Sequence, residues 1–189
     1  MNESEIIRAQ LATERIHAAQ VANACVAAFG AQHDGTAQPP TAFREASVSY
    51  LVWALSRFEQ RDQLLAELIE RNAPGSAHSA EQTGLPAELA TLAARAGTSR
   101  QALTRLEAAL AAAPQTARAP WQAFAQFFNT VWCPRREAIE SEFARLPRIA
   151  GWRAVCAVDA DSILEERARY ARVAAQLPPG VTLVGATRP

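Results

Sequence analysis

The chain contains no lysine, so all 19 of its basic residues are arginine. They are balanced by 19 Asp and Glu residues, which gives a formal net charge of zero at pH 7. A balanced charge argues against a surface devoted to nucleic acid or to an anionic membrane. We attribute arginine without lysine, together with abundant alanine, to coding bias more than to function. We therefore expect neither a nucleic-acid partner nor a membrane partner.

Cysteine and histidine are also scarce, with three residues of each. The cysteines (Cys25, Cys133 and Cys156) lie far apart and form no CxxC pair. An odd number at such spacing predicts neither a disulfide framework nor a zinc motif, and buried free thiols are expected. A reactive thiol at Cys133 is the alternative, because the neighbouring Arg135 and Arg136 would favour a thiolate.

Long apolar runs are missing too. No apolar stretch approaches the roughly 18 residues needed to cross a bilayer. The first residues, MNESEIIRAQ, are acidic where a signal peptide would be basic, so we expect a cytoplasmic protein. Nothing resembles a glycine-rich phosphate loop, a Ser-His-Asp arrangement or a basic recognition helix. The sequence therefore favours a non-enzymatic protein.

What the chain does contain is helical periodicity. With 189 residues, 49% of them hydrophobic, it is long and apolar enough for one globular domain, residues 1–189. Apolar residues recur at steps of three and four over four long segments: 4–31, 41–71, 120–146 and 151–177. We predict an all-α fold, an antiparallel up-and-down bundle of four long helices. One or two short extra helices would fall in an insertion at about 73–118, and 178–189 would form a flexible or docked tail.

Each of the four long segments interrupts its apolar stripe with a charged residue. A buried charge is costly unless it is paired or binds something. The stripes therefore predict a buried polar layer, in which one arginine would satisfy several carboxylates. Its expected members are Glu14, His17, Asp62, Arg135, Asp159 and Glu166.

The alternative interpretation of these residues is a metal-binding bundle for iron, oxygen or redox chemistry. Glu14 and His17 form a Glu-x-x-His pair, and ferritin-like bundles use two such pairs with further carboxylates. This chain has one pair, and its other two histidines fall in expected loops, whereas hemerythrin-like bundles need several helix-borne histidines. The candidate ligands for iron or another transition metal are Glu14, His17, Asp62 and Asp159. The favoured interpretation requires no cofactor.

Aromatic residues concentrate in the segment WQAFAQFFNTVW, which starts at Trp121. They span more than one helix face, and such a helix needs a second partner. Pro134 lies two residues after this segment and should kink or interrupt the helix. We expect a ligand pocket or an interface here, formed by Trp121, Phe124, Phe128, Trp132, Cys133 and Trp152. The predicted function is therefore binding of a protein partner or a small apolar ligand, with self-association as a homodimer.

Overall fold

The computed structural model describes residues 3–30, 39–71, 98–112, 118–143 and 160–183. Within these ranges the regular elements are all helices and no strand occurs. They are α1 (Glu3–Gly30), α2 (Thr41–Arg71), α4 (Thr98–Ala111), α5 (Arg118–Phe127), the π-helix η2 (Phe128–Trp132), α6 (Cys133–Phe143) and α8 (Ala160–Ala175). The all-α class expected from the sequence is confirmed. The part of the expected insertion before Thr98 and the start of the segment 151–177 lie outside the described residues.

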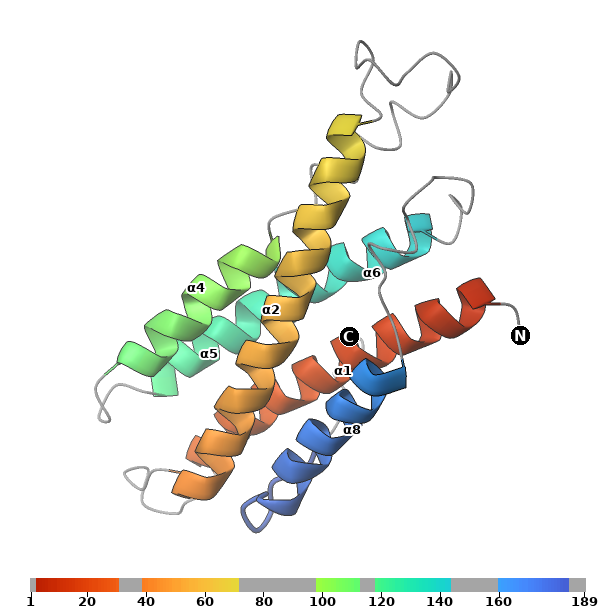
Figure 1. Cartoon of the computed structure of the whole chain (residues 1–189). Coiled ribbons are helices and arrows are strands. Elements are labelled where there is room, and N and C mark those ends of the chain that lie inside the picture. Colours follow the sequence, from red (N-terminus) through yellow and green to blue (C-terminus); the bar gives the residue numbers. More distant parts are fainter. Residues whose placement is uncertain (1–2, 31–38, 72–97, 113–117, 144–159, 184–189) are drawn as a thin grey trace.

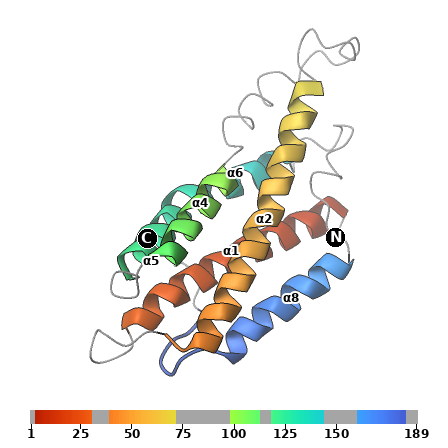
Figure 2. The same ribbon diagram turned by 60° about the vertical axis from the view of Figure 1, so that its left-hand side comes forward.

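The helices are grouped around α1 and α2 (Figure 1). Helix α2 crosses in front of α1, with α4 and α5 on one side of it and α8 on the other, and the run from α5 continues behind α2 into α6 (Figure 1). Figure 2 shows the same helices after a turn of 60°. Contacts between side chains show how α1 runs relative to η2 and α6. Arg15 of α1 pairs with Glu140 of α6, and Asn23 with Asn129 of η2, so these two helices run antiparallel.

Helix α4 departs from the expected arrangement. The sequence predicts it only as a short extra helix in an insertion beside the four long helices. It packs lengthwise instead, burying Ala102, Leu106 and Ala109 in the common core. Because α4 takes a full place beside α2 and α5, the simple four-helix bundle is not confirmed.

Small residues on α1 allow large aromatic residues to approach it. Ala18, Ala22 and Ala28 are at most 1% exposed, and the bulky core side chains come from α2, α5 and η2. Those that are less than 2% exposed include Phe43, Tyr50, Phe58, Phe124, Phe128 and Trp132. Close packing of large against small side chains is how a core reaches its normal density.

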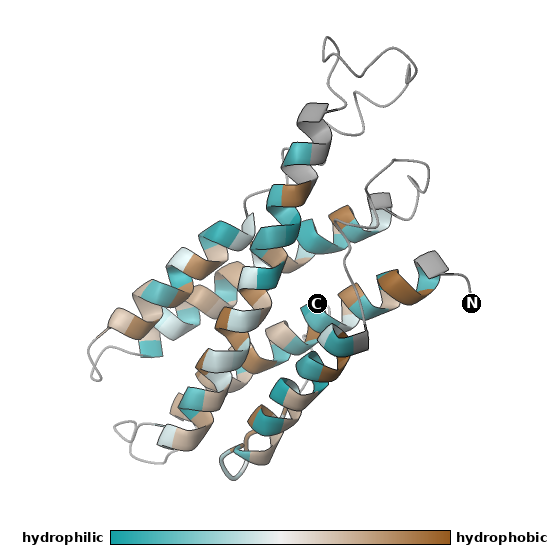
Figure 3. Ribbon diagram, in the orientation of Figure 1, coloured by the Kyte–Doolittle hydropathy of each residue, from teal (hydrophilic) through white to brown (hydrophobic). Residues whose placement is uncertain are grey.

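Hydrophobic and hydrophilic residues alternate along each helix, as coloured in Figure 3. In the part of the chain that the structure describes, no helix is both long and apolar enough to span a membrane.

The run α5–η2–α6 contains one wide turn. The N–H of Cys133 donates to the carbonyl of Phe128, five residues back. This π-type turn lies directly before Pro134, and the helix continues through the proline into α6. A π turn holds one residue more than a regular turn, so it rotates all later side chains by roughly 100° about the helix axis.

Candidate functional site

The first part of the candidate site surrounds Glu14 of α1, whose side chain is buried among arginines. Glu14 is 1% exposed. Its Oε2 accepts a hydrogen bond of 2.7 Å from Nη1 of Arg61 on α2, and Nη2 of Arg57 lies 3.9 Å from its Oε1. A buried carboxylate with a guanidinium partner of this kind links α1 firmly to α2.

The next pair joins α2 to α6. Asp62, which is 4% exposed, accepts a hydrogen bond from Nη1 of Arg136. Phe58 lies between this pair and the previous one. The Cζ atoms of Arg61 and Arg136 are 5.1 and 4.9 Å from the centre of its ring. Cation–π contact with one buried ring therefore brings both arginines into the same layer.

Arg136 replaces the arginine that the sequence pointed to. Arg135 was expected in the buried layer, but it is exposed, and Arg136 is 2% exposed. The cause is the wide turn of η2. A regular helix would carry the face of Phe124 and Phe128 on to Arg135, whereas one extra residue in the turn moves Arg136 onto that face. This corrects the expectation for Arg135.

A third pair closes the layer between α1 and α6. Nε of Arg15 donates to Oε2 of Glu140 at 3.1 Å, and Glu140 is 4% exposed. Burial raises the pKa of the Glu140 carboxyl, although Arg15 and Arg136 both act to lower it. Arg15 and Glu140 were not among the residues expected from the sequence.

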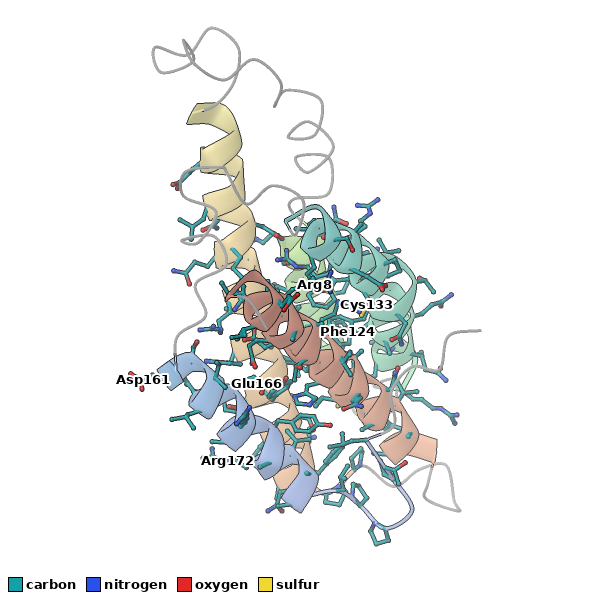
Figure 4. The ribbon with its side chains drawn as sticks, turned by 90° about the vertical axis from the view of Figure 1, so that its right-hand side faces the viewer. Arg8, Phe124, Cys133, Asp161, Glu166 and Arg172 are labelled. Atoms are coloured by element: carbon teal, nitrogen blue, oxygen red, sulfur yellow. The ribbon has the colours of Figure 1, made fainter. Side chains whose placement is uncertain are left out.

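The polar layer continues on α8 through Glu166, which is 0% exposed. Oε1 of Glu166 is 2.8 Å from Nδ1 of His17 and accepts a hydrogen bond of 2.9 Å from the hydroxyl of Tyr50. In Figure 4 Glu166 lies between α8 and α1. The His17 ring stacks on Tyr170 with their centres 3.7 Å apart. Burial, followed by the charge of Glu166, raises the pKa of the Tyr50 hydroxyl, so Tyr50 serves as a hydrogen-bond donor.

The proposed metal ligands do not converge. Glu14 is held by Arg61, Asp62 by Arg136, and His17 by Glu166, and Asp159 lies outside the described residues. No cluster of three or more His, Cys, Asp or Glu side chains suited to a metal occurs among the residues that the structure describes. The guanidinium groups beside Glu14 and Asp62 would also repel a cation. These contacts match a salt-bridged layer better than a metal centre.

The aromatic residues of the predicted pocket mostly form core. Trp121, Phe124, Phe128 and Trp132 are at most 3% exposed. Phe128 stacks on Trp132 with 4.2 Å between ring centres, and Nε1 of Trp132 donates to Ser99 of α4 at 3.2 Å. These side chains leave no exposed aromatic interface on α5 and η2.

Cys133 and Trp152 were the other two residues of that predicted pocket. Cys133 is partly buried at the start of α6, and burial raises the pKa of its thiol to about 12. A thiol with so high a pKa is a poor nucleophile, because the thiolate is the reactive form. Trp152 lies outside the described residues.

Helices α1 and α4 end, and α2 and α5 begin, at the same end of the molecule (Figure 1). Residues of these four helices line a cleft there. Its volume is about 630 Å³. The residues around it are mainly apolar, with a polar minority from α2: Phe29, Pro39, Val48, Ala109, Leu110, Ala112 and Trp121, then Arg44, Glu45 and Ser49. Of the predicted pocket residues, Trp121 therefore lines a cleft, which lies at the start of the helical run and away from Pro134.

No protein-family model, curated protein or solved structure matches the chain. The function must therefore be inferred from the geometry of the chain itself.

Proposed function

We propose that this protein binds a small, largely apolar molecule in the cleft between α1, α2, α4 and α5, and that it acts by binding rather than by catalysis. The observation that carries the proposal is the cleft itself. Sites for small molecules typically have volumes of about 300–1,000 Å³, mostly apolar walls and a few polar groups that orient the ligand. A cleft of about 630 Å³ with apolar walls from four helices fits this description.

The walls of the cleft are well supported. Trp121 is 3% exposed and packs edge-on against Phe124, with 5.8 Å between ring centres. Val48 and Phe29 are packed against the same core. A wall held by the core changes little when a ligand enters, so little ordering has to accompany binding.

The polar residues lie on the α2 side. Arg44, Glu45 and Ser49 contribute one positive, one negative and one hydroxyl group. Their charges balance, which favours an uncharged ligand body with a hydrogen-bonding end over a strongly ionic one.

The test is titration of the purified protein with an uncharged fluorescent naphthylamine. We expect saturable binding that Val48→Phe weakens at least about tenfold, because the added ring occupies the cleft and a tenfold loss corresponds to about 1.4 kcal/mol. Val52→Phe is the matched control, since Val52 lies one turn further along α2 and is 41% exposed. Absence of saturable binding to the wild type, or equal binding by both variants, would refute the proposal.

A further inference from the structure

The outward face of α1 that lies between α5 and α8 carries no charge. From Ala9 to Ala27 the outward positions recur every three or four residues, and all are exposed or half-exposed. They are Ala9, Thr13, Ile16, Gln20, Asn23 and Ala27. Figure 4 looks onto this side of the molecule, with α1 in front, α8 to its left and α5–α6 to its right.

The neighbouring face of α5 and η2 is uncharged as well, and a groove runs between the two helices. The groove has a volume of about 560 Å³. Four amide side chains (Asn23, Gln122, Gln126 and Asn129) line it, together with Val26, Ala27 and Ala125. We call these seven residues the amide groove.

One polar atom in the amide groove is unsatisfied. Nδ2 of Asn129 donates to Oδ1 of Asn23 at 2.7 Å. Oδ1 of Asn129 is buried and accepts no hydrogen bond. A buried acceptor without a donor is costly, and each such atom in a folded protein calls for a partner.

We propose that the amide groove is a homodimer interface, occupied by the same groove of a second copy of this chain. A two-fold axis places a surface patch against itself, so any net charge on the patch would repel its own copy. An amide carries both a donor and an acceptor and can therefore pair with an identical amide. The exposed faces of α4 and α8 are charged instead, with Arg100, Arg105, Glu107, Asp161, Glu165, Arg167 and Arg172.

The size of the face supports a modest dimer. The helix from Ala9 to Ala27 spans about 27 Å at about 1.5 Å per residue, and two adjacent helices are about 20 Å wide. Each copy would then cover roughly 500 Å², or about 1,000 Å² in total, which is the lower limit for a specific interface. Ile16, 44% exposed on the same face, would add an apolar contact. This interface is independent of the proposed ligand cleft, which does not include Gln126.

Sedimentation of the full chain over about 5–200 μM tests the interface, since small interfaces give micromolar dissociation constants. The monomer mass is 20.4 kDa, so the dimer has twice that mass. We expect the wild type to be dimeric at the upper concentrations. Gln126→Arg should be monomeric throughout, because the two-fold axis brings two like charges together.

Gln101→Arg is the matched control, because Gln101 is an exposed glutamine in the middle of a charged face of α4. It should dimerise like the wild type, and both variants should keep the wild-type circular dichroism spectrum. A mixture of Gln126→Arg and Gln126→Glu chains should restore the dimer.

Three outcomes overturn the proposal. The first is a monomeric wild type at the highest concentration, and the second is a Gln126→Arg variant that dimerises as well as the wild type. The third is a chain ending at Leu183 that dimerises while the full chain does not. That result would assign the groove to residues 184–189 of the same chain.

Discussion

Substitution of methionine at Arg136 and at Arg135 in separate variants tests the register that the π-helix imposes. Arg136→Met removes the guanidinium from the carboxylate of Asp62, which is 4% exposed. Breaking a buried pair while one charge remains costs about 3–5 kcal/mol. Arg135 is exposed, and surface substitutions usually change stability by no more than about 0.5 kcal/mol.

Urea denaturation followed by far-ultraviolet circular dichroism measures this difference. With a denaturant slope of about 2–3 kcal/mol per molar, Arg136→Met should lower the midpoint by about 1–2.5 M, and Arg135→Met should leave it within about 0.3 M. Arg136→Lys, which keeps the charge but loses the planar fork, should fall between them. The reasoning is refuted if Arg135→Met costs as much as Arg136→Met, because the helix would then follow regular α-helical spacing through Pro134.

Three further predictions concern single contacts of the polar layer and its surroundings. Tyr50→Phe should lower the free energy of unfolding by about 1.5–3 kcal/mol, since Glu166 loses a buried donor. The hydroxyl of Tyr170 is only partly buried and donates to Gln20, so Tyr170→Phe should cost less. Equal losses in the two variants would contradict the assigned role of Glu166. Alkylation of Cys133 at pH 8, in a chain with Cys25 and Cys156 replaced by alanine, should be at least about 100-fold slower in the native than in the unfolded protein. The reason is that burial raises its pKa to about 12, far above the ordinary value of about 8.5; comparable rates would show an accessible thiolate. Dialysis against a chelator should leave the melting temperature unchanged, because arginines already pair with Glu14 and Asp62; a fall that added iron or zinc reverses would support the metal interpretation.

The helices of this protein follow closely from local signals in the sequence. The expected helix at 41–71 appears as α2 with the same ends, because paired prolines precede it and its apolar residues keep the helical period. The helix expected at 4–31 appears as α1, Glu3–Gly30. Counting residues from the connection between α1 and α2 places Glu14 at the height of Asp62 along the helices. Glu14 pairs with Arg61, the residue before Asp62.

The pairing of charges was harder to predict than their burial. Pro134 predicted an irregularity in the helix, but the sequence did not indicate whether the helix would bend, stop or contain a wider turn. Only a wider turn places Arg136 on the buried face. The burial of Tyr50 and Arg61 could have been predicted from the sequence. Positions 50, 54, 58 and 61 of α2 recur at steps of three and four, as the residues of a buried helix face do. Their partners depend on how α8 and α1 cross α2, and that crossing is a property of the packed helices.

The buried polar layer raises the question of whether it supplies stability or specifies one packing of the helices. Replacing a whole buried ion pair by apolar residues of similar volume is often neutral or stabilising, because desolvation of the charges no longer opposes folding. We therefore expect the double variant Asp62→Leu/Arg136→Met to recover the stability that Arg136→Met alone loses, to within about 1 kcal/mol of the wild type.

The same double variant should be less uniquely packed if the charges fix the register between α2 and α6. Trp132 reports on this packing, because its ring lies 4.9 Å from that of Phe58 in a near-perpendicular arrangement. A weaker near-ultraviolet circular dichroism signal at wild-type stability would show that the layer specifies the arrangement of the helices. A double variant as unstable as Arg136→Met, with the native signal retained, would show instead that the pair contributes stability directly.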